Sequence, residues 1–194
     1  MSSLTLDFKG PLTFSAGERC LFESEYRDAA CVYLWTTQSG LDGSYWIHYI
    51  GETGRLSLRQ RQHLTQILGL NYGINDVGAA GKETEEYVWR GMWRELRDAN
   101  RAGPMRCVEL YQKLAPDVVK YVEALSVFVA PVDIDRRLRE HVEGSIARNL
   151  RANHPEFCAQ YSTDCRTGVG EDRGIRLEIT WGAPIAGLDP VLDI

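Results

Sequence analysis

The 194-residue sequence lacks any apolar run of the roughly 20 residues that a membrane-spanning helix requires. Its first residues, MSSLTLDFKG, have neither the basic start nor the apolar core of a signal peptide, so we expect no secretion signal there. The five cysteines are scattered, and none form the close pairs that a zinc or redox motif needs. These absences favour a cytoplasmic protein without a membrane partner, whose cysteines are reduced and mostly buried.

An excess of positive charge is also missing. The formal net charge is −5 at pH 7, which by itself argues against a nucleic-acid partner, although phosphate contact depends on local charge. The stretch GAAGKET resembles a phosphate loop, but no glycine stands five residues before Gly81, and Glu83 follows Lys82 where Ser or Thr is required. We therefore expect no nucleotide cofactor.

What is present includes two segments typical of strands, CVYLWTT (31–37) and SYWIHYIG (44–51), which are rich in aromatic and β-branched residues. The link between them contains Asp42-Gly43, which favours an antiparallel hairpin. Because side chains alternate along a strand, Tyr33 and Tyr49 would share one face of the sheet if the register permits it.

Further along the chain, apolar spacing predicts several more elements. Ser57 and Gln60 suggest a capping box at the start of a helix, and Gly103-Pro104 would end a later one. The predicted elements are helices over 57–68, 82–103 and 105–114, a buried strand over 122–131, a helix over 134–151 with Asp133 or Asp135 as its cap, and a strand over 175–181. The pattern indicates an α/β (α+β) protein with a small, mainly antiparallel sheet flanked by helices.

Tyr33, Tyr49, Arg59, His63 and Glu143 form a set that would suit phosphodiester hydrolysis. That reaction needs a base for the attacking water, cations for the non-bridging oxygens and a metal for the leaving oxygen. An arginine binds phosphate at two points. One carboxylate can suffice for Mg²⁺, which keeps much of its water shell.

In these residues the sequence resembles the GIY-YIG nuclease superfamily. Cys31-Val32-Tyr33 is similar to the first motif and Tyr49-Ile50-Gly51 to the second, and Arg59 and His63 follow at the family's spacing. VEGSIARNLRANHPEF is similar to the family's glutamate helix, with Glu143 in the place of the glutamate. The resemblance implies a nuclease domain over 30–158 with a helical insertion at about 82–116. Residues 1–29 would then be an N-terminal strand extension, and 159–194 a C-terminal strand and tail packed on the same domain.

The resemblance also implies roles. Tyr33 would activate the attacking water or lie beside it, and Tyr49 would position the phosphate or the water. Arg59 would hold the scissile phosphate, and His63 would support proton removal through a tyrosine. Glu143 would bind the single divalent cation, Mg²⁺ or Mn²⁺. Which tyrosine is the base stays open, but its pKa would have to fall from about 10, and Arg59 and the metal both favour the phenolate.

Three departures from the family are visible. Cys31 stands where the first motif has glycine, and the link between the tyrosine motifs is longer than usual. Many members have an asparagine about a dozen residues after the glutamate, where this chain has Pro155, and either Asn149 or Asn153 could replace it. None of these departures removes a catalytic group.

Arginines give a second signal for nucleic acid. Those at 90, 94, 97 and 101 would form one stripe on the predicted helix 82–103, which could follow a phosphate backbone or be a solvated face with acidic neighbours. The arginines expected to bind nucleic acid are Arg55, Arg61, Arg90, Arg94, Arg97, Arg101, Arg136 and Arg139.

Each residue alone has an ordinary explanation: a tyrosine suits any strand, and Glu143 could pair with Arg139 at the surface. Five matching types in order favour an endonuclease that cuts DNA by direct water attack. The alternatives are a non-catalytic module of the same fold that recognises branched DNA or RNA, and a coincidental match on an unrelated α/β enzyme. A homodimer, as in compact restriction enzymes, and a repair or mobile-element role both stay open, as does substrate specificity.

Overall fold

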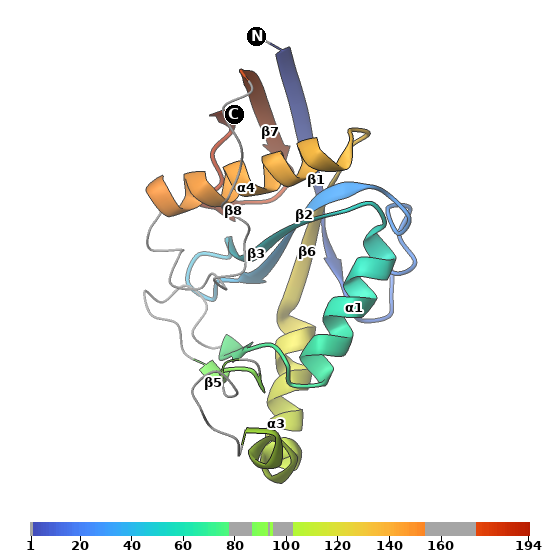
Figure 1. The fold of residues 1–194 in the computed structure, drawn as a ribbon, viewed down its shortest axis with the longest axis vertical. Helices are drawn as coiled ribbons and strands as arrows, with labels where there is room; N and C mark the ends of the chain where they lie inside the picture. The colour runs from blue at the N-terminus through green and yellow to red at the C-terminus, as the bar shows by residue number, and fades with distance from the viewer. Residues whose placement is uncertain (1, 78–86, 93, 95–102, 154–173) are drawn as a thin grey trace.

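The computed structural model describes residues 2–77, 87–92, 94, 103–153 and 174–194 (Figure 1). Its elements are β1 (Ser2–Thr13), β2 (Cys31–Gln38), β3 (Tyr45–Thr53), α1 (Leu56–Leu68), β4 (Ile74–Asn75), β5 (Tyr87–Trp89), α3 (Gly103–Ala124), β6 (Leu125–Pro131), α4 (Arg136–Asn153), β7 (Ile175–Trp181), β8 (Ile185–Ala186) and β9 (Val191–Asp193). In the part of the chain described, no helix is both long and apolar enough to cross a membrane.

Seven strands form one curled sheet in the order β8-β3-β2-β6-β1-β7-β9, and β4 pairs with β5 separately. Neighbouring strands of the large sheet are antiparallel except β1 beside β7 and β3 beside β8. The expected mixed α+β architecture with a mainly antiparallel sheet is therefore confirmed. The sheet is larger than the small one expected, because β1 and β7, expected as strands at the two ends of the domain, join it together with the additional strand β9.

The predicted hairpin is confirmed as β2 and β3. Tyr33 lies opposite Gly51, and Trp35 lies opposite Tyr49, so Tyr33 and Tyr49 are diagonal neighbours on the same face of the sheet. After Trp35 the register shifts, because Thr36 pairs with Ile47 and leaves one residue of β3 as a bulge. The alternation read from the sequence thus places the two phenols side by side.

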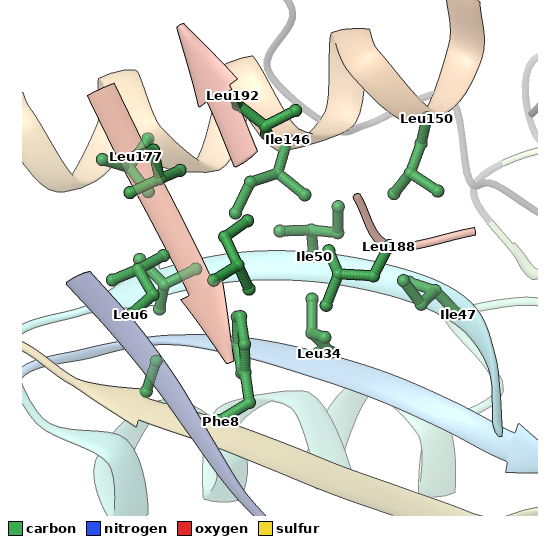
Figure 2. Packing of buried hydrophobic residues seen from close by; sticks show 14 of the residues in the cluster. Leu6, Phe8, Leu34, Ile47, Ile50, Ile146, Leu150, Leu177, Leu188 and Leu192 are labelled. Carbon is green, nitrogen blue, oxygen red and sulfur yellow. The ribbon is translucent and has the colours of Figure 1, made fainter. Parts of the chain in front are cut away.

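Two hydrophobic cores cover the two faces of the sheet. On one face, Val32 and Leu34 of β2 belong to the same core as residues of α4. Figure 2 shows Leu34 on the side of the sheet that faces Ile146 and Leu150 of α4. On the other face, the core contains Cys31, Tyr33 and Trp35 of β2 together with residues of α1 and α3. The helices α1 and α4 therefore lie on opposite faces of the sheet, and side chains that alternate along β2 point towards one or the other.

The capping box predicted for α1 is wrong. The helix begins at Leu56, its N-cap residue Arg55 makes no side-chain capping bond, and both Ser57 and Gln60 are buried inside the helix. The first backbone N–H groups are satisfied by the loop before β2: Leu56 N–H donates to the carbonyl of Ala29, and Ser57 N–H to that of Arg27. A tertiary contact thus replaces the local cap.

The prediction of one long helix over 82–103 is also wrong at the residues of this range that the structure describes. Residues Tyr87–Trp89 form β5, which pairs with β4, and the chain turns at Gly91 with a φ of +91° before helical residues resume at Met92. Gly103 begins α3 and ends no helix. Arg90 and Arg94 are consequently not on one continuous helix, whereas Arg97 and Arg101 lie outside the described residues.

The later elements agree with the sequence pattern. The buried strand is β6, the final strand is β7, and the helix expected over 134–151 is α4. The carboxylate of Asp135 accepts a hydrogen bond from the backbone N–H of Leu138 at 2.9 Å, so Asp135, one of the two candidates, caps this helix. The helix expected over 105–114 is part of the longer α3, which continues through Pro116.

Candidate active site

The two phenols of the hairpin lie against the backbone of Gly51. The ring centroids of Tyr33 and Tyr49 are 6.0 Å apart. A Cβ atom at Gly51 would lie under 3.0 Å from the phenol end of Tyr33 and 2.8 Å from Cε1 of Tyr49. Glycine is therefore the one residue that lets both rings occupy these positions, which gives a physical reason for the Tyr-Ile-Gly sequence.

His63 lies on the buried face of α1, directly against Tyr33. The Tyr33 hydroxyl is 2.8 Å from Nε2 of His63, and the imidazole meets the Trp35 ring edge-on with centroids 4.8 Å apart. The Trp35 indole N–H donates to the Gln60 side chain at 2.9 Å, which fixes the indole against α1. Burial, with the positive charge of Arg59 nearby, lowers the pKa of His63 to about 3, so the imidazole is neutral at physiological pH.

Arg59 lies one turn before His63 and is half-buried. Its guanidinium lies close enough to both phenols for the charges to influence each other. Burial lowers the pKa of Arg59, but Tyr33 and Tyr49 outweigh that effect and raise it. Tyr33, Tyr49, Arg59 and His63, which we call the tyrosine cluster, therefore form one contiguous group from three elements.

The pKa of Tyr33 departs from expectation. It is raised well above its ordinary value, because the side chain is buried and Tyr49 lies beside it. Arg59 acts in the expected direction and lowers this pKa, but burial has the larger effect. Tyr33 is fully buried and Tyr49 is partly exposed, so Tyr49 is the phenol closer to solvent.

Cys31 stands where the resemblance to the GIY-YIG superfamily would lead one to expect a glycine. Its side chain is fully buried in the core below the tyrosine cluster, and burial raises the pKa of its thiol to about 12. This thiol is therefore protonated and unreactive under ordinary conditions. Cys20 is likewise a buried free thiol.

Glu143 is more than nine-tenths buried on α4, across the sheet from the helix that carries Arg59 and His63. The strand β3 lies towards one edge of the sheet. In the described part of the chain, β8 is the strand beside that edge, and it pairs only with Tyr45 and Trp46. Tyr49, a residue of β3, packs against both hydrophobic cores, so its ring lies between the two faces of the sheet.

A buried ion pair joins α4 to β3 next to Glu143. Nε of Arg139, one turn before Glu143, is 3.1 Å from the Glu52 carboxylate, and the side chains of Arg139 and Glu52 are only 9% and 13% exposed. Arg139 also donates to the carbonyl of Ile134. Arg139, expected as a DNA-binding residue, is therefore turned into the structure and paired, because α4 packs against the end of β3.

Replacing Arg139 by methionine should destabilise the protein by about 3 kcal/mol, because the Glu52 carboxylate would stay buried without its partner. Arg136→Met is the matched control: Arg136 lies on the same helix and pairs with Glu140 at the surface, so its loss should cost less than about 0.5 kcal/mol. Urea unfolding of both variants measures the difference. Equal stabilities of the two variants would contradict a structural role for Arg139.

The other described arginines that were expected to bind nucleic acid are exposed, except Arg94, which is half-buried. Arg55 pairs with Asp28 at 2.8 Å, and Arg136 pairs with Glu140 at 3.0 Å. The guanidinium groups at 61 and 94 lie over the rings of Phe22 and Tyr87, at 5.8 and 5.1 Å from the ring centroids. Arg90 is exposed. The expected helical stripe is not formed by its two described members, because Arg90 precedes the turn at Gly91 and Arg94 follows it.

Two asparagines were considered in place of the family's asparagine. Asn153, in the last turn of α4, donates to the Asp189 carboxylate at 3.4 Å, and Asn149 is also on α4. Pro155, at the position of the family's asparagine, lies outside the described residues. The structure thus gives no contact between Asn153 and the tyrosine cluster.

Side chains that sequence reasoning missed also contact the cluster. The sequence could have indicated Trp35 and Gln60, because Trp35 follows Tyr33 by two residues on a strand and Gln60 precedes His63 by three residues on a helix. The hydroxyl of Tyr72 lies 3.3 Å from Nδ1 of His63. No local signal pointed to Tyr72, which follows α1 in a loop.

A divalent cation is compatible with the chemistry of Glu143. Among the described residues, no three His, Cys, Asp or Glu side chains gather closely enough to hold a metal ion by themselves. Mg²⁺ does not need such a cage, because it keeps several waters and takes further oxygens from a phosphate. The chemistry of a single buried carboxylate such as Glu143 is therefore compatible with this ion.

Comparisons of the chain with protein-family models, with curated proteins and with solved structures found no match. A functional assignment therefore depends on the geometry of the tyrosine cluster and on the chemistry of its side chains.

Proposed function

We propose that the protein is a metal-dependent endonuclease of the GIY-YIG type, which hydrolyses DNA phosphodiester bonds by direct attack of water. The observation that carries this proposal is the tyrosine cluster. Placing two phenols, a guanidinium and an imidazole together in a largely buried site is costly for a fold, and such clusters are typical of functional sites. The mixed sheet with helices on both faces is compatible with this type of nuclease.

In the proposed reaction, Arg59 holds the non-bridging oxygens of the scissile phosphate, since its guanidinium is the accessible cation of the cluster. Tyr49 meets the attacking water because it is the phenol closer to solvent. Tyr33 lies beside Tyr49, with ring centroids 6.0 Å apart, and its hydroxyl is 2.8 Å from Nε2 of His63. The cluster is thus a chain of proton carriers that leads from the surface to the buried imidazole.

Each proton that is released in this series of side chains is taken up by the next group. As the water oxygen bonds to phosphorus, its proton moves to Tyr49, the proton of Tyr49 moves to Tyr33, and that of Tyr33 moves to Nε2 of His63. The P–O bond to the leaving oxygen breaks, and that oxygen takes a proton from solvent. Neither phenol has to exist as a free phenolate, which agrees with the raised pKa of Tyr33.

Two further groups support this chemistry. A phosphate bound at Arg59 offsets its positive charge, which is one cause of the lowered pKa of His63, so binding of substrate makes the imidazole a better base. Glu143 would hold the divalent cation, Mg²⁺ or Mn²⁺. When bound, that ion supplies charge stabilisation for the leaving oxygen.

The second candidate function is a non-catalytic module of the same fold that binds branched DNA or RNA. The observation that favours it is the complete burial of Tyr33, which leaves Tyr49 as the sole route by which the two phenols reach water in this conformation. In that case the arginines around the cluster would bind phosphate, and no bond would break.

Incubation with supercoiled plasmid, and with a panel of duplex, flap, branched and RNA substrates, tests the proposal. We expect nicked or linear DNA in the presence of Mg²⁺ or Mn²⁺, and none in EDTA. Binding of the same substrates is followed in parallel by fluorescence anisotropy. Tight binding with no cleavage of any substrate in either metal would support the binding module and reject the nuclease.

A further inference from the structure

His63 is held between two phenols. On one side, the Tyr33 hydroxyl is 2.8 Å from Nε2, and on the other side the Tyr72 hydroxyl is 3.3 Å from Nδ1. The ring centroids of His63 and Tyr72 are 5.8 Å apart. Both ring nitrogens of this histidine therefore have a specific partner, and the partner of Nδ1 is a residue outside the tyrosine cluster.

The loop that carries Tyr72 is held in place by the segment around β5. Leu70 has a φ of +56°, and its carbonyl accepts hydrogen bonds from the Trp89 indole N–H at 2.8 Å and from the Met92 backbone N–H at 2.9 Å. Gly91 packs so closely that a Cβ there would lie 2.8 to 2.9 Å from backbone atoms of residues 71–73. Residues 89–92 thus press directly on the backbone beside Tyr72.

The hydrogen bonds of Tyr33 indicate where the proton of His63 resides. The guanidinium of Arg59 acts on Tyr33 as a nearby positive charge with only donor groups, so it favours a phenol whose oxygen lone pairs face it and whose proton points elsewhere. The Tyr33 proton needs an acceptor, and Nε2 lies at 2.8 Å. A neutral imidazole that accepts at Nε2 carries its proton on Nδ1, where the oxygen of Tyr72 can receive it.

We propose that Tyr72 is a positioning residue that fixes His63 in the tautomer with its proton on Nδ1, so that Nε2 is free to accept the proton of Tyr33. The segment around β5, through Trp89, keeps Tyr72 in that position. The catalytic consequence of this arrangement rests on the proposed nuclease function, whereas the tautomer is a property of the folded protein alone.

The variant Tyr72→Phe tests the proposal, since it removes the hydroxyl and keeps the ring. Long-range ¹H–¹⁵N NMR spectra of the full chain report which nitrogen of His63 carries the proton. We expect protonated Nδ1 in the wild type, and a mixture of tautomers in the variant. The rate constant for magnesium-dependent nicking should fall about tenfold, as expected for the loss of one hydrogen bond, with DNA affinity unchanged.

Two more variants make the test specific. Tyr111→Phe is the matched control, because Tyr111 is exposed on α3 away from the cluster, and it should change neither the tautomer nor the rate. Trp89→Phe removes the indole donor to Leu70 and should shift the tautomer in the same direction as Tyr72→Phe, by a smaller amount. If Tyr72→Phe does not fold, the tautomer of His63 in Trp89→Phe still tests the proposal.

A wild-type His63 protonated at Nε2, or a tautomer that both variants leave unchanged, would overturn the proposal. A tautomer that shifts as expected in a protein that cuts no substrate would support the positioning role of Tyr72 and reject the nuclease function. The two hypotheses can therefore fail separately.

Discussion

Glu143→Gln should abolish magnesium-dependent cleavage, with a fall in rate of about a thousandfold or more. A metal ion contributes several kcal/mol to stabilisation of the transition state, and an amide oxygen binds Mg²⁺ far more weakly than a carboxylate does. Glutamine has nearly the same volume as glutamate, so the packing of α4 against the sheet should persist. Nicking of supercoiled plasmid measures the rate, and calorimetric titration with Mn²⁺ measures loss of the ion site.

The control for this experiment is Glu140→Gln. Glu140 lies on the same helix, three residues before Glu143, and pairs with Arg136 at the surface. It should retain wild-type cleavage and Mn²⁺ binding. DNA binding of both variants should match that of the wild type, because Arg59 and the surface arginines are unchanged. Cleavage by Glu143→Gln at the wild-type rate would refute the assignment of the ion to this carboxylate.

The hairpin and α4 were predictable because their signals are local. Aromatic and β-branched residues on both sides of Asp42-Gly43 favour two paired strands, and alternation along them is enough to bring Tyr33 and Tyr49 to one face. Asp135 precedes a regular apolar spacing, so both the start and the buried face of α4 could be read from the sequence.

The errors arose where distant segments decide the local structure. Val88 and Met92 fit helical spacing, but Tyr87–Trp89 pairs with β4 instead, and Gly91 takes a backbone conformation that suits glycine. The start of α1 is satisfied by carbonyls of the preceding loop, so the local capping residues were not needed. Neither contact leaves a periodic trace in the sequence.

In the candidate site, too, the features set by local spacing could be predicted and those set by contacts between distant segments could not. The spacing from Gly51 to Arg59 and His63 fixes those side chains on one helix beside the hairpin, so their approach to the phenols could be anticipated. The burial of Arg139 against Glu52 depends on how α4 meets β3 across the sheet. The sequence could therefore indicate the residue types of the candidate site, but it could not indicate that Arg139 would be buried.

Gly51→Ala should have the second large effect, on both stability and cleavage. A methyl group there would lie under 3.0 Å from the phenol end of Tyr33 and 2.8 Å from the Tyr49 ring. Both rings must move, although Tyr33 is fully buried and its hydroxyl is hydrogen-bonded to His63. We expect a loss of about 1–3 kcal/mol in the free energy of unfolding, as for other overpacked sites.

The effect on cleavage should exceed what the loss of stability explains. A displacement of about 1 Å in a catalytic group can reduce a rate about a hundredfold, so nicking under conditions where the variant is fully folded should fall by roughly that factor. Urea unfolding establishes the folded fraction, and single-turnover cleavage at low temperature measures the rate.

Gly54→Ala is the matched control for this substitution. Gly54 lies three residues further along the same segment, and a Cβ there would meet only the end of the Arg139 side chain at 3.7 Å, an ordinary contact. It should keep wild-type stability and cleavage. If Gly51→Ala cleaved as fast as Gly54→Ala, the phenols could shift without consequence, and the tyrosine cluster could not be the place where the attacking water loses its proton.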